Sequence, residues 1–105
     1  GEFLGKRQRL YDIMRQHELG IDITRMQKLF FNLKYSLKFD NLLYKKVGYP
    51  LLASISAGLF CDPYGITSLR EYFASGFEAY YMGDRMYLKK VCPQLYNKIN
   101  ELNEE

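Results

Sequence analysis

The chain has 105 residues, of which 48% are hydrophobic, 26% charged and 16% aromatic. This composition excludes an intrinsically disordered chain, and the length is that of a single domain. The net charge of +3 reflects 15 basic and 12 acidic side chains, too small an excess to indicate nucleic acid or a membrane as the partner. No segment is apolar over the ~18 residues that a membrane span requires, so we expect a soluble protein with no membrane partner.

We expect one compact all-α domain of about five short helices over residues 4–105. Residues 1–3 (Gly-Glu-Phe) are typical of a cloning scar and are left out of this expected fold. No segment alternates between apolar and polar residues over the length of a strand. The pattern therefore predicts helices with short connections between them.

Apolar residues at steps of three and four predict the N-terminal helices. The first is expected from Leu4 to Leu19 and ends at Gly20. We expect it to expose a basic face made by Lys6, Arg7 and Arg9. A second stripe predicts one amphipathic helix through Met26, Leu29, Phe30, Leu33 and Leu37.

The middle of the chain continues this pattern as far as Gly48. Asp40-Asn41 is a candidate start for a separate short helix within it. The apolar stretch from Tyr49 to Cys61 predicts a buried helix with Pro50 in its first turn. Residues 61–65 (Cys-Asp-Pro-Tyr-Gly) form a dense turn signal that ends this helix.

The C-terminal part begins with a helix opened by Ser68, whose hydroxyl is expected to cap it in a capping box with Glu71. This helix is expected to run to about Met82, where Gly83-Asp84 breaks it. Two shorter helices follow, the second opened by Cys92-Pro93. Cys61 and Cys92 fit no metal-binding spacing. We expect two buried free thiols, with a disulfide as the alternative.

The segment from Asp62 to Tyr81 resembles the C-terminal end of the anthrax-lethal-factor-like zinc peptidases, in its Tyr-Gly turn and its Glu-aromatic-Phe-Ala helix. The closing residues 87–96 resemble the last helix of that family, and the likeness covers residues 62–102, about two fifths of the chain. The resemblance implies that Glu71 matches a zinc ligand and that Tyr64 matches a tyrosine that stabilises the oxyanion. It also implies a bacterial or phage source, and hence a cytoplasmic or virion-associated protein.

The metal motif of that family is incomplete in this chain. His17-Glu18 resembles its His-Glu pair, but Ile21 stands where the second histidine is needed, and Ser75 replaces a second glutamate. Both remaining candidate ligands also have a structural role that needs no metal. Glu71 can form a capping box with Ser68, and His17 can stand at a helix end, where its partial positive charge suits the helix dipole. We therefore expect a non-catalytic relative or fragment of this family that needs no cofactor.

The alternative is a zinc-dependent endopeptidase. In one version of it His17 and Glu71 bind the metal, Glu18 is the general base and Tyr64 donates to the oxyanion. In the other version Glu71 is a metal ligand and the metal-binding helix lies in sequence outside this chain.

The expected partner of the non-catalytic module is another protein or a second copy of the chain. The helix that ends at Met82 carries more aromatic rings than one face can bury, so we expect a partner surface made by Tyr72, Tyr80, Tyr81 and Met82. A third interpretation is a small basic domain that binds nucleic acid through Lys and Arg side chains with Tyr stacking.

Overall fold

A computed structural model describes residues 1–17 and 22–104, and these residues form helices and connections without a strand. The all-α prediction is confirmed. The molecule is elongated, with extents of 46 × 23 × 19 Å. The elements follow in this order: α1 (Glu2–Gln16), η1 (Ile23–Met26), α2 (Gln27–Phe30), α3 (Leu37–Asn41), η2 (Leu42–Gly48), α4 (Tyr49–Ser56), η3 (Pro63–Ile66), α5 (Leu69–Met82), α6 (Arg85–Val91) and α7 (Pro93–Glu104).

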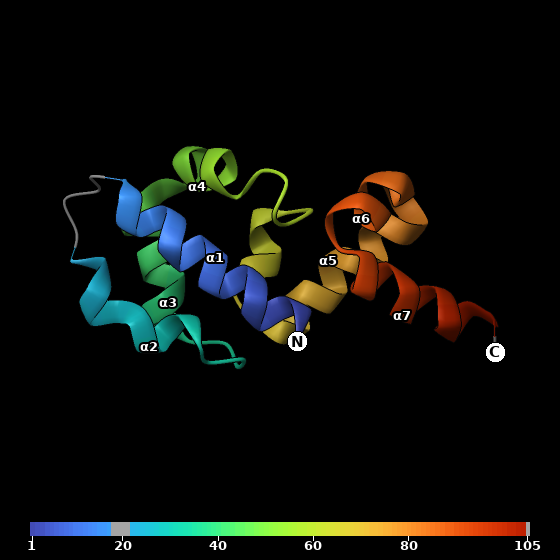
Figure 1. The fold of residues 1–105 in the computed structure, drawn as a ribbon, viewed down its shortest axis with the longest axis horizontal. Coiled ribbons are helices and arrows are strands. Elements are labelled where there is room, and N and C mark those ends of the chain that lie inside the picture. Colours follow the sequence, from blue (N-terminus) through green and yellow to red (C-terminus); the bar gives the residue numbers. More distant parts are fainter. Residues whose placement is uncertain (18–21, 105) are drawn as a thin grey trace.

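Helix α1 runs through the middle of the larger half of the molecule, with α2 and α3 on one side of it and α4 on the other (Figure 1). Helices α5, α6 and α7 form an arm at the end where α1 begins (Figure 1). The close packing of α5 on α7 requires Gly76, since a Cβ there would stand 2.5 Å from Leu95 Cδ2. None of the described helices is long and apolar enough to cross a membrane.

The structure differs from the expected fold at the N-terminus, because Glu2 and Phe3 belong to the first turn of α1. Phe3 is buried against Phe60 and Tyr72. The carboxylate of Glu2 accepts the hydroxyl of Tyr72 and the backbone N–H groups of Gln94 and Leu95 at the start of α7. Residues 2 and 3 therefore connect α1 to the C-terminal arm.

The expected long helix through Met26 and Leu37 is wrong. Helix α2 ends at Phe30, and Leu33 and Leu37 are 38% and 65% exposed. Two local features favour the break. Ser36 Oγ accepts the N–H of Phe39 and starts α3, and Asn32 Oδ1 accepts the N–H of Lys34.

The run from α3 to α4 is helical in segments, because η2 has the wider hydrogen-bond spacing of a π-helix and Gly48 adopts φ +90° before α4. Its first helix starts at Leu37, earlier than the candidate start at Asp40-Asn41. The prediction of a buried helix from Tyr49 to Cys61 is correct only in part. Helix α4 stops at Ser56 and buries Leu52, while Tyr49 lies exposed.

The C-terminal helices begin where the capping signals predict. Ser68 Oγ accepts the N–H of Glu71, Asp84 accepts the N–H of Tyr87, and α7 opens at Pro93. Asp62 caps the short turn η3 by accepting the N–H of Tyr64. A local polar side chain is enough to define each of these helix starts.

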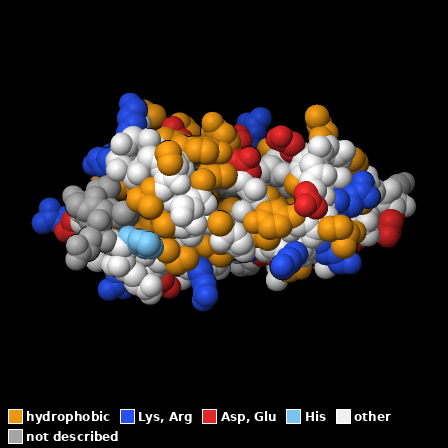
Figure 2. Space-filling view, turned by 90° about the horizontal axis from the view of Figure 1, so that it is seen from above, with side chains coloured by type: hydrophobic (Ala, Val, Ile, Leu, Met, Phe, Trp, Pro, Cys, Tyr) orange, Lys and Arg blue, Asp and Glu red, His pale blue; other side chains and the backbone are white. Residues whose placement is uncertain are grey.

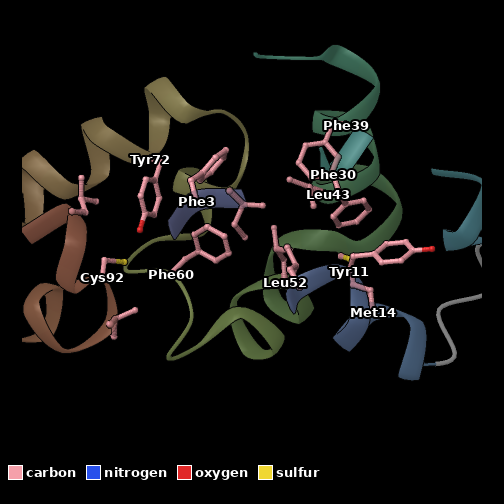
Figure 3. Packing of buried hydrophobic residues seen from close by; sticks show 14 of the residues in the cluster. Phe3, Tyr11, Met14, Phe30, Phe39, Leu43, Leu52, Phe60, Tyr72 and Cys92 are labelled. Carbon is pink, nitrogen blue, oxygen red and sulfur yellow. The ribbon is translucent and has the colours of Figure 1, made fainter. Parts of the chain in front are cut away.

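The core contains two groups of aromatic rings (Figure 3). In the first, Phe30 packs against Tyr11 and Phe39, with ring centroids 5.2 and 4.9 Å apart. The second consists of Phe3, Phe60 and Tyr72, already described at the start of α1.

Arg7 lies between these two groups and is fully buried, so its prediction as part of an exposed basic face is wrong. Its guanidinium carbon lies 4.7 Å from the centroid of Phe3 and 4.3 Å from that of Phe39. Nη1 donates to the carbonyls of Leu29, Phe30 and Asn32, and Nε donates to the carbonyl of Ile66 at 2.6 Å. None of the described carboxylates forms an ion pair with Arg7.

Burial lowers the pKa of Arg7 to about 10, so the guanidinium remains charged at neutral pH. Its charge is balanced by carbonyl dipoles and by the faces of two rings. The last carbonyls of α2 have no partners within the helix, and Arg7 supplies their donors. The end of α2 is thus fixed by a residue more than twenty positions earlier in the chain.

Replacing Arg7 by alanine is expected to lower the free energy of unfolding by about 4 kcal/mol, because several carbonyls lose their donor and the stacking between two rings is lost. Chemical denaturation followed by circular dichroism measures this change. Arg9→Ala on the exposed face of the same helix is the control, and it should change stability by less than about 0.5 kcal/mol. Equal effects of the two substitutions would contradict the role assigned to Arg7.

Candidate functional site

The structure does not bring the two predicted metal ligands together. His17 follows the last residue of α1, whereas Glu71 lies in the first turn of α5. The residue after Glu71, Tyr72, contacts Glu2 at the opposite end of α1. Because α1 spans 15 residues, the two ends are separated by about 22 Å. Helix α1 thus holds His17 far from Glu71.

Tyr64 and Glu71 do lie near each other, in a shallow hollow of about 220 Å³ that Asp62, Ser75 and Glu78 also line. Both side chains are exposed. Three carboxylates and a phenol can accept and donate protons, but the hollow includes no imidazole and no thiol. The Tyr64 ring packs beside other tyrosine rings, 5.6 Å from Tyr44 between centroids. Its surroundings match those of a packing tyrosine.

Whether the described residues could hold zinc depends on the positions of their donor groups. Within residues 1–17 and 22–104, no three His, Cys, Asp or Glu side chains come together in a group able to hold a metal ion. Glu18, the predicted general base, lies outside the described residues. The described donors do not fit a zinc centre, and we derive no catalytic step through that metal.

Of the four residues of the predicted partner surface, two are buried and two are exposed. Tyr72 and Tyr80 are buried, so their assignment to an exposed surface is wrong. Their hydroxyl groups find partners inside the fold: Tyr72 donates to Glu2, and Tyr80 donates to Asn100 at 2.8 Å. Buried tyrosines are retained in a core when their hydroxyl groups are satisfied in this way.

Tyr81 and Met82, the other half, are 56% and 85% exposed. Tyr81 stacks on Phe77 with nearly parallel rings and donates its hydroxyl to Asn103 of α7. Met86 and Tyr87, just beyond the turn into α6, are also exposed. We call these four residues (Tyr81, Met82, Met86 and Tyr87) the α5–α6 corner.

Basic side chains belong to the same helix, α6, as part of this corner. Lys89 and Lys90 lie exposed in the last turn of α6. Arg85 is fixed at the start of the same helix, where its guanidinium lies 4.0 Å from the centroid of Tyr80 and donates to the carbonyl of Tyr80. The face shown in Figure 2 has apolar side chains exposed at several places, with Lys and Arg side chains between them.

A second concave surface, of about 530 Å³, lies between η1–α2 and α3–η2. Four basic side chains line it together with apolar ones and Asn41, and no acidic residue is among them: Arg25, Lys28, Lys38 and Lys46. Arg25 also forms an ion pair with Asp22 at 3.2 Å. We call this surface the basic hollow. The sequence analysis missed it, because no single run of the chain holds all four cations.

No protein-family model, no curated protein and no solved structure matches this chain.

Adding zinc chloride is expected to leave the melting temperature of the chain unchanged, because the described donor groups do not converge on one point. A tight site saturated to 1,000 times its Kd would stabilise the folded chain by about 4 kcal/mol, which thermal denaturation detects readily. Glu71→Ala is the matched variant. A zinc-dependent rise in Tm that disappears in this variant would support the peptidase alternative.

Proposed function

We propose that the chain is a non-catalytic helical module that binds another protein through the α5–α6 corner. The exposure of Met82, the most exposed of the large apolar side chains described, is the observation that carries the proposal. Flexible methionine side chains beside aromatic rings form adaptable contacts with apolar partner surfaces. We also propose that residues 62–102, which resemble the C-terminal end of the lethal-factor-like peptidases, share ancestry with that family.

The charge around the corner indicates the chemistry of the partner. Lys89 and Lys90 supply positive charge on α6, and one exposed carboxylate, that of Asp84, lies between Met82 and Met86 at the start of this helix. A partner with an apolar helical face flanked by Asp or Glu would match both features, since apolar side chains would cover the methionines while carboxylates meet the lysines. We therefore assign an amphipathic, acidic helix as the partner element.

Met82→Glu is expected to weaken binding of such a helix at least tenfold, because it places a carboxylate in the apolar contact and opposite acidic flanks. Fluorescence anisotropy with a synthetic amphipathic helix measures this, using one peptide with Glu flanks and a second with the same apolar face and Lys flanks. Leu37→Glu, which changes an apolar residue that is 65% exposed and lies outside the corner, is the control and should bind as the unaltered chain does. Equal binding of both peptides, or of both variants, would contradict the proposal.

A second candidate function, binding of a nucleic-acid backbone, is favoured by the basic hollow. Four cations in a concave surface present several donors to phosphate groups, and apolar residues such as Met26 and Leu29 lie between them. The net charge of the whole chain gives no such indication, because no acidic side chain lines the hollow, although Asp22 pairs with Arg25 beside it.

Lys46→Ala is expected to weaken binding of single-stranded DNA and to reduce the slope of log K against log salt by about 0.7, because one phosphate contact is lost. Lys45→Ala is a closely matched control, since Lys45 is exposed next to Lys46 but does not line the hollow. Filter binding over a series of salt concentrations measures both. If neither substitution changes the slope, the hollow is not the contact surface.

A further inference from the structure

A hollow that none of the sites above includes lies where the start of α1 meets α5 and α7. Its volume is about 350 Å³, within the range of about 300–1,000 Å³ that is typical of small-molecule sites. We call it the apolar hollow, because most of the residues that line it are apolar. Those that come from outside residues 1–3 are Leu4, Leu33, Leu69, Phe73 and Leu95.

The walls of the apolar hollow are held in place by contacts within the fold. The N–H of Leu69 donates to the carbonyl of Leu33 at 2.9 Å, which fixes the connection before α3 against the start of α5. Leu69 and Phe73 are one turn apart in α5, so both side chains lie on one face of that helix. A hollow whose walls are fixed in this way needs little reorganisation to accept an apolar ligand.

The buried side of the hollow is formed by Phe3, Tyr72 and Leu95. The rings of Phe3 and Tyr72 lie side by side, with centroids 5.0 Å apart (Figure 3). The hydroxyl of Tyr72 donates to the carboxylate of Glu2, which also accepts the N–H groups of Gln94 and Leu95 at 2.8 and 3.3 Å. These polar groups are therefore bonded to one another, and the charge of Glu2 disfavours a second carboxylate beside them.

The exposed side of the hollow carries a positive charge. Gln94 and Lys98 line it from α7, one turn apart, and both are exposed. None of the described carboxylates forms an ion pair with Lys98. An ammonium group and a side-chain amide at the rim can both donate to a carboxylate of a ligand, while an apolar part of the same ligand occupies the buried side.

We propose that the apolar hollow binds a medium-chain fatty acid, with its hydrocarbon tail against Phe73 and Leu95 and its carboxylate at Lys98. Three features favour this class of ligand. The walls remove methylene groups from water, the rim supplies a cation, and the charge of Glu2 keeps an anionic head group away from the buried side. The hollow shares no residue with the α5–α6 corner, so this site is independent of the proposed protein contact.

Decanoate, used below the concentration at which it forms micelles, is the probe for the unaltered chain. Isothermal titration calorimetry is expected to show one decanoate per chain. The melting temperature should rise with decanoate concentration, because a ligand that binds only the folded chain stabilises it. Butyrate, which has the head group and only a short tail, should cause no shift.

Decylammonium has the same tail as decanoate with the opposite charge, and it is expected to bind about tenfold more weakly. Absence of decanoate binding, several decanoate molecules per chain, or equal binding of decanoate and decylammonium would overturn the proposal.

Lys98→Met tests the assigned head-group contact. It removes the charge of an exposed side chain and keeps most of its length, so the fold should be unaffected. Decanoate is expected to bind about tenfold more weakly to this variant, whereas decanol, which has the same tail and no charge, should bind as it does to the unaltered chain. Lys28→Met, which removes a cation of the basic hollow, is the matched control. Unchanged decanoate binding in Lys98→Met, or a loss in Lys28→Met instead, would overturn the assigned site.

Leu33→Asp tests the apolar wall. Leu33 is 38% exposed in a connection between helices, and the melting temperature without ligand checks that the variant folds. Decanoate and decanol are both expected to bind about tenfold more weakly, because a carboxylate would lie against the tail. Leu37→Asp, at a position that is 65% exposed and does not line the hollow, is the control. Equal binding of decanol by the two variants would show that the tail lies elsewhere.

Discussion

The buried guanidinium of Arg7 is the interaction on which the rest of the fold depends. It lies between the rings of Phe3 and Phe39, which belong to the two aromatic groups of the core. Its N–H groups reach backbone carbonyls at the end of α2 and at Ile66 in η3. A buried charge is costly unless its donors are satisfied, and here backbone carbonyls accept from Nε and Nη1, while Nη2 is buried without a partner among the described residues. One side chain of α1 thereby fixes the positions of two distant turns.

The first turn of α1 performs a similar role towards the C-terminal arm. Glu2 accepts hydrogen bonds from α5 and α7, and Lys6 donates to Val91 at the end of α6. Each of these contacts holds a polar group of the arm to a residue near the start of the chain. The arm therefore depends on α1 for its position, and Tyr72 lies at the junction between them.

The same packing decides which aromatic residues remain at the surface. Helix α5 turns Tyr72 and Tyr80 inward, where Glu2 and Asn100 accept their hydroxyl groups, and this leaves Tyr81 and Met82 on the outside. The packing also decides where the potentially reactive side chains lie. The carboxylates near Tyr64 lie in an exposed hollow, whereas His17 is at the far end of α1. The described imidazole and these carboxylates are therefore held apart by the length of α1.

The sequence by itself determined the helical class and the starts of the C-terminal helices. These features are local: periodic apolar residues, Ser68 and Asp84 as caps, and Pro93 in a first turn act within a few positions of where they stand. The sequence also predicted that Tyr81 and Met82 lie at the surface, because their helix carries more aromatic rings than one face can bury.

Tertiary structure alone decided the break after Phe30 and the burial of Arg7. Met26, Leu29 and Leu33 have helical spacing, yet Arg7 takes up the carbonyls that a continuing helix would have used for its own hydrogen bonds. Basic residues in a helix are ordinarily solvated, and only the meeting of two aromatic groups made a buried position favourable for one of them.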